Sequence, residues 1–118
     1  MANTIEKVNP ITLTFKDGKT YTLEFNRNSV QSAERAGITL QDVLEMSKPA
    51  TVIPILFFAA FKMHHPDMTR EKADKIIAEI GGLPNTVVQR LIELYVTPIN
   101  TLIRDEDDGE AKNVTISL

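Results

Sequence analysis

The chain has 118 residues, of which 42% are hydrophobic and 25% are charged, and it contains neither cysteine nor tryptophan. This length fits one domain with a single modest core. The lack of cysteine excludes disulfide scaffolds, thiolate zinc sites and cysteine nucleophiles. The formal net charge of −3 provides no basic surface for nucleic acid or an anionic membrane, so we expect neither as a partner.

The acidic residues are concentrated near the C-terminus. Residues 105–112 (DEDDGEAK) carry a charge of −4, which leaves the rest of the chain close to neutral at +1. Because this stretch has few apolar residues to pack, residues 105–118 are predicted to be an acidic, flexible C-terminal tail. Within it, Val114, Ile116 and Leu118 alternate with polar residues, so this part can form a strand only if another strand pairs with it.

No part of the sequence is predicted to cross a membrane. The longest apolar stretch, residues 52–61, would span about 15 Å as a helix, about half the thickness of a bilayer core. The N-terminus lacks the apolar core of a secretion signal. We therefore expect a soluble protein that stays in the cell that makes it.

The first predicted element is a β-hairpin over residues 10–26. Apolar and polar residues alternate on both sides of Asp17-Gly18, which is typical of two half-buried strands. A three-residue loop, 16–18, keeps the apolar residues on one face, whereas a two-residue loop would mix the faces. The longer loop also places Gly18 where a left-handed residue is needed. It predicts that Leu13 pairs with Tyr21 and Ile11 with Leu23.

Two short helices are predicted next. Asn26 can cap a helix that ends at Gly37, and Thr39 can cap a second one, with Asp42 three residues further along. Lys48-Pro49 is expected to end the second helix. The residues predicted to face inward on the two helices are Val30, Ala33, Ala36, Leu40, Val43 and Leu44.

The third predicted helix runs from about Thr51 to His65, with Pro54 in its first turn. It is apolar on almost every side. Such a helix either lies in the centre of a core or has part of its surface covered by another chain. Since a two-stranded hairpin covers only one face, we expect some of this apolar surface to remain for a partner.

Two further helices complete the predicted fold. One runs from Arg70 to Ile80 between the capping Thr69 and Gly81-Gly82, and the other begins at Pro84. Pro98 either kinks the last helix or begins a final turn. The predicted fold class is thus α+β, an N-terminal hairpin followed by four to five helices in a small, mainly helical domain. Residues 1–104 form this single domain, with helices in 27–104.

We find no constellation of residues that predicts catalysis, a cofactor or a metal, and we do not expect an enzyme. The adjacent His64 and His65 would point about 100° apart on a helix, which is unsuitable for one shared ion. A place at the C-terminal end of a helix, where positive charge is favoured, explains them better. No serine lies in a nucleophile turn, and Gly81-Gly82 lacks the lysine of a phosphate loop.

The aromatic residues of the third helix have two interpretations. Phe57 and Phe61 lie on one face of the helix and Phe58 on a neighbouring one. They either pack in the core beneath the hairpin or bind an apolar helix of another protein. On the second interpretation, the candidate partner-binding residues are Phe57, Phe58, Phe61, Leu91 and Tyr95. Self-association through the same surface is compatible with this pattern.

The order of these segments resembles the tail assembly chaperones of long-tailed phages and prophages of Gram-positive bacteria. The resemblance covers roughly residues 10–104 and follows the hairpin with its Asp17-Gly18 turn. The other segments that carry it are 21–27 (YTLEFNR), 33–37 (AERAG), 54–61 (PILFFAAF) before His64-His65, and 91–95 (LIELY) before Pro98-Ile99.

The resemblance implies a non-enzymatic role in the cytoplasm of the host bacterium. Proteins of this family are thought to coat the apolar, helical tape measure protein and keep it soluble while the tail tube assembles. In many members a ribosomal frameshift produces a longer form that recruits the tail tube protein, and the acidic stretch lies where such an extension would begin. The alternative function is structural, as a head–tail connector or tail completion protein of the virion.

Overall fold

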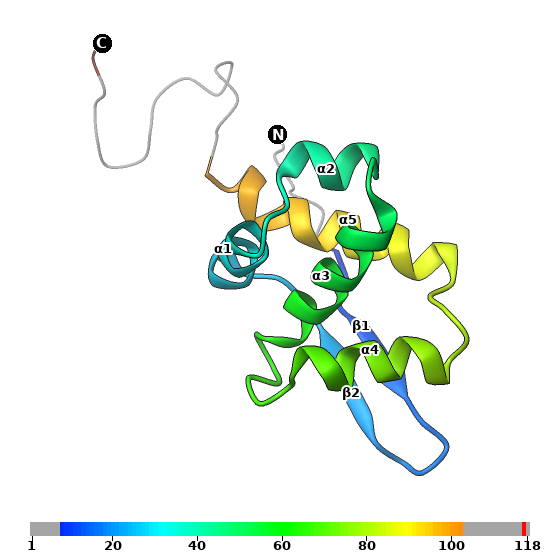
Figure 1. The fold of residues 1–118 in the computed structure, drawn as a ribbon. Coiled ribbons are helices and arrows are strands. Elements are labelled where there is room, and N and C mark those ends of the chain that lie inside the picture. Colours follow the sequence, from blue (N-terminus) through cyan, green and yellow to red (C-terminus); the bar gives the residue numbers. More distant parts are fainter. Residues whose placement is uncertain (1–7, 103–116, 118) are drawn as a thin grey trace.

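A computed structural model describes residues 8–102 and 117. Their fold is a two-stranded antiparallel hairpin followed by five helices, packed into a mainly helical α+β domain (Figure 1). The elements in chain order are β1 (Ile11–Thr14), β2 (Thr20–Leu23), α1 (Arg27–Arg35), α2 (Leu40–Glu45), α3 (Pro49–Phe61), α4 (Arg70–Glu79) and α5 (Asn85–Asn100). The predicted fold class is therefore confirmed.

The hairpin has the predicted register. Ile11 pairs with Leu23 and Leu13 with Tyr21, and the loop closes by a hydrogen bond of 2.8 Å from the Phe15 backbone N–H to the Lys19 carbonyl. Gly18 has a φ of +92°, a conformation that costs a glycine little. The three-residue loop is thus confirmed.

The C-terminal end of α3 covers the outer edge of β2. The backbone N–H of Glu24 donates to the Ala60 carbonyl at 3.0 Å, and the N–H of Thr22 donates to Nε2 of His65 at 2.9 Å. Both donors point away from β1. A helix end and a histidine therefore satisfy strand donors that an exposed sheet edge would leave to water.

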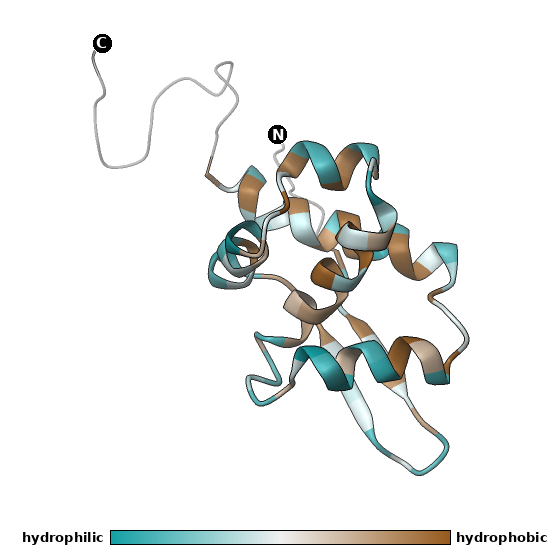
Figure 2. Cartoon of the chain, in the orientation of Figure 1, coloured by the Kyte–Doolittle hydropathy of each residue, from teal (hydrophilic) through white to brown (hydrophobic). Residues whose placement is uncertain are grey.

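The apolar helix α3 lies in the centre of the core. It contacts α1, α4, α5 and β2, and Figure 2 shows the hydrophobic stretches of α3 and α5 gathered in the middle of the molecule. The buried residues of α3 are Val52, Ile55, Leu56, Phe57, Ala59, Ala60 and Phe61. The apolar composition of α3 was explained either by a central position in the core or by coverage from another chain. The central position is correct, because four elements cover the helix and not the hairpin alone.

The predicted bounds of α3 were wrong at both ends. The helix begins at Pro49, because that proline occupies the first helical position, where its fixed φ favours a helix start. Pro54 consequently lies inside the helix rather than in its first turn. The helix ends at Phe61, before the two histidines, whose backbone N–H groups both donate to the Phe61 carbonyl.

The two capping predictions for α1 and α2 are confirmed, and two core predictions are not. Ala36, predicted to face inward, is the C-cap of α1 and is exposed. Asn26 and Thr39 each accept a hydrogen bond from the backbone N–H three residues on, and each belongs to a capping box. Leu44, predicted to face inward, is 58% exposed. The reason is that α2 is only six residues long and ends at Met46, which has a left-handed φ of 49°. Only Val43 of this helix is buried.

The last two helices follow the predicted segments closely. Thr69 caps α4, which ends at Glu79, one residue earlier than predicted. Pro98 does not begin a separate final turn, since α5 continues through it to Asn100. No helix in the described residues is long and apolar enough to cross a membrane. The predicted acidic tail, 105–118, lies outside the described residues except for Ser117.

Candidate partner-binding groove

The structure places most of the predicted partner-binding side chains inside the core. Phe57, Phe61, Leu91 and Tyr95 are 0% exposed, and Phe57 and Phe61 pack edge to face at 5.0 Å. Phe58 is half-buried, with Nζ of Lys62 4.7 Å from its ring centre. The core-packing interpretation thus describes the position of four of the five. Contact with a partner would require them to leave the core, so their partner-binding role stays a prediction.

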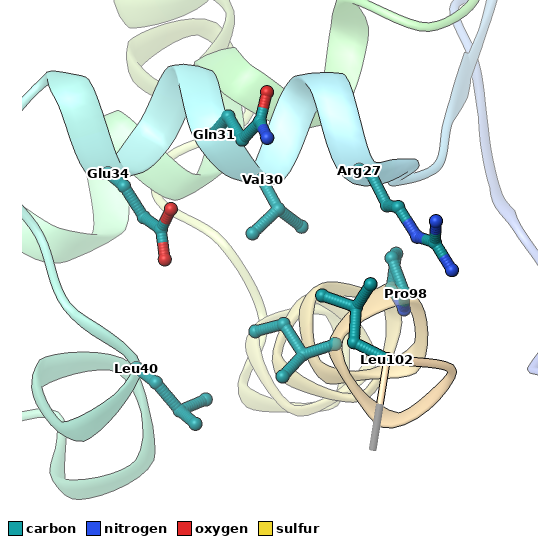
Figure 3. Close-up of a pocket in the computed structure, with 8 residues that line it drawn as sticks. Arg27, Val30, Gln31, Glu34, Leu40, Pro98 and Leu102 are labelled. Carbon is teal, nitrogen blue, oxygen red and sulfur yellow. The ribbon is translucent and has the colours of Figure 1, made fainter. Parts of the chain in front are cut away.

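An apolar groove lies instead between α1, α2 and the C-terminal end of α5 (Figure 3). Its volume is about 390 Å³. The apolar residues that line it come from all three helices, and the polar ones all come from α1. The apolar lining consists of Val30, Leu40, Pro98, Ile99 and Leu102, and the polar lining of Arg27, Gln31 and Glu34.

The continuation of α5 through Pro98 creates one wall of the groove. A proline lacks the N–H that would bond to the fourth carbonyl before it, yet Pro98 is buried and α5 remains helical. Ile99 follows on the same turn, and Leu102 lies just after the helix, in a turn in which its N–H donates to the Ile99 carbonyl at 2.9 Å. If α5 ended at Pro98, the side chains of Ile99 and Leu102 would not be placed in the groove wall.

The capping box of α2 fixes the opposite wall. The backbone N–H of Thr39 donates to the Asp42 carboxylate at 3.0 Å, and the Asp42 N–H donates to the Thr39 hydroxyl at 3.1 Å. Hydrogen bonding from the Thr39 backbone N–H, and then from its side chain, lowers the pKa of the Asp42 carboxyl below its ordinary value. Leu40 is the first residue of the helix held in this way, so the box determines where Leu40 meets the groove.

Apolar surface continues beyond the groove itself. Leu44 lies one turn after Leu40, and residues four apart share one side of a helix. Leu44 is 58% exposed and Leu102 is 60% exposed. These are the two most exposed of the large hydrophobic residues described. The groove and these two leucines therefore present a larger apolar surface than the pocket alone.

Charged groups of both signs border the groove on α1. Arg27, Gln31 and Glu34 follow helical spacing, which places the two charged residues about two turns, or about 10 Å, apart. Figure 3 shows these three side chains along the helix beside the groove. The Arg27 guanidinium donates to the Thr101 hydroxyl at 3.3 Å, so it spans one end of the groove. Among the described residues, Glu34 forms no ion pair.

The side chains of the two histidines, which were predicted at the C-terminal end of a helix, contact residues of the hairpin segment. His64 Nε2 lies 2.8 Å from the Glu24 carboxylate, and His65 accepts from Thr22. Both residues follow α3, so the predicted position after a helix is approximately right, but their partners were not predicted. Within residues 8–102, no three His, Cys, Asp or Glu side chains are close enough together to hold a metal ion.

Sequence reasoning identified the groove residues only as parts of inward faces. Val30 and Leu40 fit the helical apolar spacing, and Ile99 and Leu102 follow Pro98, where the sequence left a kink and a final turn as alternatives. Nothing in that spacing shows that the three helices leave a gap. The one available signal is that apolar residues near the ends of the helical stripes, Leu44 and Leu102, remain exposed.

Comparison with known proteins identifies a family without an assigned role. The model of a domain of unknown function, DUF5055, matches residues 1–118. Neither the curated proteins nor the solved structures contain a match to the chain. Because the family model covers the whole sequence, the protein belongs to the DUF5055 family.

Proposed function

We propose that this protein is a phage tail assembly chaperone that binds the tape measure protein and keeps it soluble while the tail tube forms. The observation that carries the proposal is the apolar groove bordered by α1, α2 and α5, with Leu102 exposed in its lining and Leu44 exposed beside it. The resemblance in segment order to such chaperones supplies the kind of partner.

The shape and lining of the groove suit an amphipathic helix. Helix-binding grooves receive apolar side chains that repeat every three or four residues. The apolar lining is supplied by five side chains from three parts of the chain: Val30, Leu40, Pro98, Ile99 and Leu102. An apolar side chain inserted between them removes surface from water on both proteins, which is favourable by about 25 cal/mol for each Å².

The polar residues of the groove support binding rather than catalysis. Binding sites for small substrates usually hold a few polar groups that converge inside an apolar pocket. In this groove the charged side chains, Arg27 and Glu34, are exposed and come from one helix. They are placed to orient a partner helix that carries an acidic and a basic residue about two turns apart.

Co-expression tests this function. The partner is the long helical protein encoded beside this chain, expressed with or without it, and the soluble fraction of the partner is measured. We expect the wild-type chain to raise that fraction several-fold. Leu102→Asp, which places a charge in the groove, should abolish the increase. Ile80→Asp is the matched control, because Ile80 is also exposed, at 40%, but lies on α4, away from the groove.

Two results would contradict the proposal. One is a partner that is no more soluble with the wild-type chain than without it. The other is an equal effect of Leu102→Asp and Ile80→Asp on the solubility of the partner. If the groove binds the partner, a charge in the groove must reduce that solubility more than a charge at the end of α4. A flanking pair of tube and tape measure genes supports the proposal, whereas recovery of the chain in purified virions favours a structural role as a connector or completion protein.

The proposed function also implies a location and a second partner. A chaperone of tail assembly acts in the cytoplasm of the host bacterium, before the virion is complete. A longer form made by frameshifting would add a contact with the tail tube protein. Sequencing of the gene and mass spectrometry of the expressed products would reveal such a form.

A further inference from the structure

The outer edge of β1 is open in the part of the chain that the structure describes. In an antiparallel pair, successive residues direct their backbone groups alternately toward and away from the partner strand. Because Phe15 bonds to Lys19 across the hairpin, Thr12 and Thr14 direct their N–H and carbonyl groups away from β2. Neither has a backbone hydrogen bond on that side among the described residues, and both side chains are exposed.

The opposite edge of the hairpin is largely covered. The outward N–H of Thr22 donates to His65, and that of Glu24 donates to the Ala60 carbonyl. On this edge, only Thr20, next to the hairpin loop, has an outward N–H without such a bond among the described residues. A further strand can therefore pair along β1 but not along β2.

We propose that β1 is a dimer interface, in which the β1 strands of two copies of this chain pair antiparallel about a two-fold axis at Leu13. In this register Thr12 of each copy faces Thr14 of the other. Each facing pair exchanges backbone N–H to carbonyl hydrogen bonds in both directions. All outward backbone groups of both threonines are then bound, and the two hairpins form one continuous sheet.

The residues that flank β1 select this register. One alternative register places Pro10 opposite Thr14, and a proline nitrogen has no hydrogen to donate. The other alternative places Lys16 opposite Thr12, but Lys16 begins the hairpin loop, where the chain turns. The register centred on Leu13 is the one that pairs extended residues with extended residues.

The charges of the strand permit pairing with a second copy. Residues 11–15 carry no charge, so no like charges face each other along the paired strands. The Lys16 residues of the two copies lie at opposite ends of the pair, about 20 Å apart. This separation exceeds the screening length of about 8 Å in physiological salt, so repulsion between these lysines is small.

The same register brings the half-buried faces of the two strands together. Ile11, Leu13 and Phe15 are half-buried and share one face of β1. Across the two-fold axis Ile11 faces Phe15, and a β-branched side chain beside an aromatic ring is a favourable cross-strand pair. A hollow of about 620 Å³ beside Phe15, between the hairpin and the C-terminal end of α4, provides space on this face. Pairing thus removes apolar surface from water.

The assembly is closed and weak. Since the β2 edge of each hairpin is covered, pairing stops at two copies and does not continue into a fibre. A pair of short strands buries less than the roughly 1,200 Å² of a stable interface. We therefore expect a dissociation constant of about 0.1 to 1 mM, which the tests below must reach.

Light scattering and NMR on the full chain test this pairing between about 10 µM and about 1 mM protein. We expect the mass to rise toward that of a dimer, and the Thr12 and Thr14 amides to exchange several-fold more slowly at the higher concentration. In a mixture of isotope-labelled and unlabelled protein, a filtered nuclear Overhauser effect should connect the Leu13 α-protons of the two copies.

A proline at an outward position separates edge pairing from the fold. Thr12→Pro removes an outward donor and no hydrogen bond to β2, so it should weaken the dimer at least about tenfold. Thr20→Pro is the matched control, because Thr20 points outward from the other strand, and it should dimerise like the wild type. The amides of α3 report that both variants are folded.

Several results would overturn the proposal. One is a wild-type chain that remains a monomer at about 1 mM, and another is equal dimerisation of Thr12→Pro and Thr20→Pro. Slow exchange at Thr12 and Thr14 that is independent of concentration would also overturn it, since the same chain would then cover the edge. If Thr12→Pro does not fold, the wild-type mass and the contact between Leu13 residues decide the question. None of these results bears on the groove between α1, α2 and α5.

Discussion

The His65 side chain stabilises a sheet edge by accepting a hydrogen bond. Its Nε2 accepts from the Thr22 N–H at 2.9 Å, so this nitrogen carries no proton and the other ring nitrogen does. The ring also packs edge to face on Tyr21 and Phe61, at 5.2 and 6.2 Å. The residue therefore contributes both packing and an acceptor, and these contributions can be separated.

Replacing His65 with phenylalanine retains the ring but removes the acceptor. We expect His65→Phe to lower the free energy of unfolding by about 1 kcal/mol, because the half-buried Thr22 N–H loses its partner. His64→Phe is the matched control, since its exposed hydrogen bond with the Glu24 carboxylate is worth less, within about 0.5 kcal/mol. Urea unfolding at pH 7.5 measures both. Equal effects would show that the Thr22 bond adds nothing.

The Tyr95 hydroxyl is buried and has no hydrogen-bond partner among the described residues. Burial raises the pKa of this hydroxyl to about 12, with smaller contributions from the negative charges of Glu34 and Asp42. A buried hydroxyl without a partner costs free energy. We expect Tyr95→Phe to leave the stability at neutral pH unchanged or to raise it by up to about 1 kcal/mol. A loss of more than that in urea unfolding would contradict this.

The raised pKa of Tyr95 also predicts a response to alkali. The unfolded chain releases the proton near the ordinary pKa of about 10, whereas the folded chain holds it up to about 12. The contribution to stability is therefore complete below pH 10 and is lost as the pH rises toward 12. Unfolding curves at pH 9 and pH 11 should show a smaller decline in Tyr95→Phe than in the wild type.

Some residue roles could be predicted and others could not. Gly18, Asn26 and Thr39 act through local backbone geometry, which sequence spacing encodes directly. His65 acts on a residue 43 positions away, so its partner depends on the packing of α3 against the hairpin. The exposure of Leu44 likewise depends on where a short helix ends.

Helix capping sets the position of α1, and with it one side of the groove. The Asn26 side chain accepts from the Ser29 N–H at 2.9 Å, and the Ser29 hydroxyl accepts from the Asn26 N–H at 2.9 Å. Ser29 is 2% exposed, so this box lies at the edge of the core. Its two bonds satisfy donors that the first turn of any helix leaves free.

We expect Asn26→Ala to destabilise the fold by about 1 kcal/mol, because it leaves the Ser29 N–H without its side-chain acceptor. Asn28→Ala is the matched control, an exposed asparagine of the same helix, and should change stability by less than about 0.5 kcal/mol. Thermal unfolding by circular dichroism compares the two. The account of the cap fails if both variants unfold at the same temperature as the wild type.

At the level of elements, periodicity predicted the type of each segment better than its ends. The hairpin register followed from the need to keep Leu13 and Tyr21 on one face. The ends of α3 did not follow, since Pro49 and Pro54 compete as helix starts and only packing decides between them. Pro98 was ambiguous for a similar reason: whether a helix continues through a proline depends on what surrounds it.

For the whole molecule, the exposed apolar surface lies elsewhere than the sequence predicted. The sequence predicted that part of the apolar surface of α3 would remain exposed for a partner. The surplus on α3 is covered by four surrounding elements, so it builds the core. The surface that remains apolar arises where α1, α2 and α5 meet incompletely, with Leu44 and Leu102 exposed. A gap between three helices has no signature in the spacing of any one of them, so the groove could not be named among the candidate partner-binding residues Phe57, Phe58, Phe61, Leu91 and Tyr95.

Chemical-shift mapping tests the central claim, that this groove binds an apolar helix, most directly. Isotope-labelled protein is titrated with a synthetic peptide from an apolar helical segment of the proposed partner, a tape measure protein. We predict saturable shifts centred on Val30, Leu40, Ile99 and Leu102, which Leu102→Asp weakens at least about tenfold and Ile80→Asp leaves unchanged. Shifts confined to the hairpin and α4, or equal binding by both variants, would contradict the account.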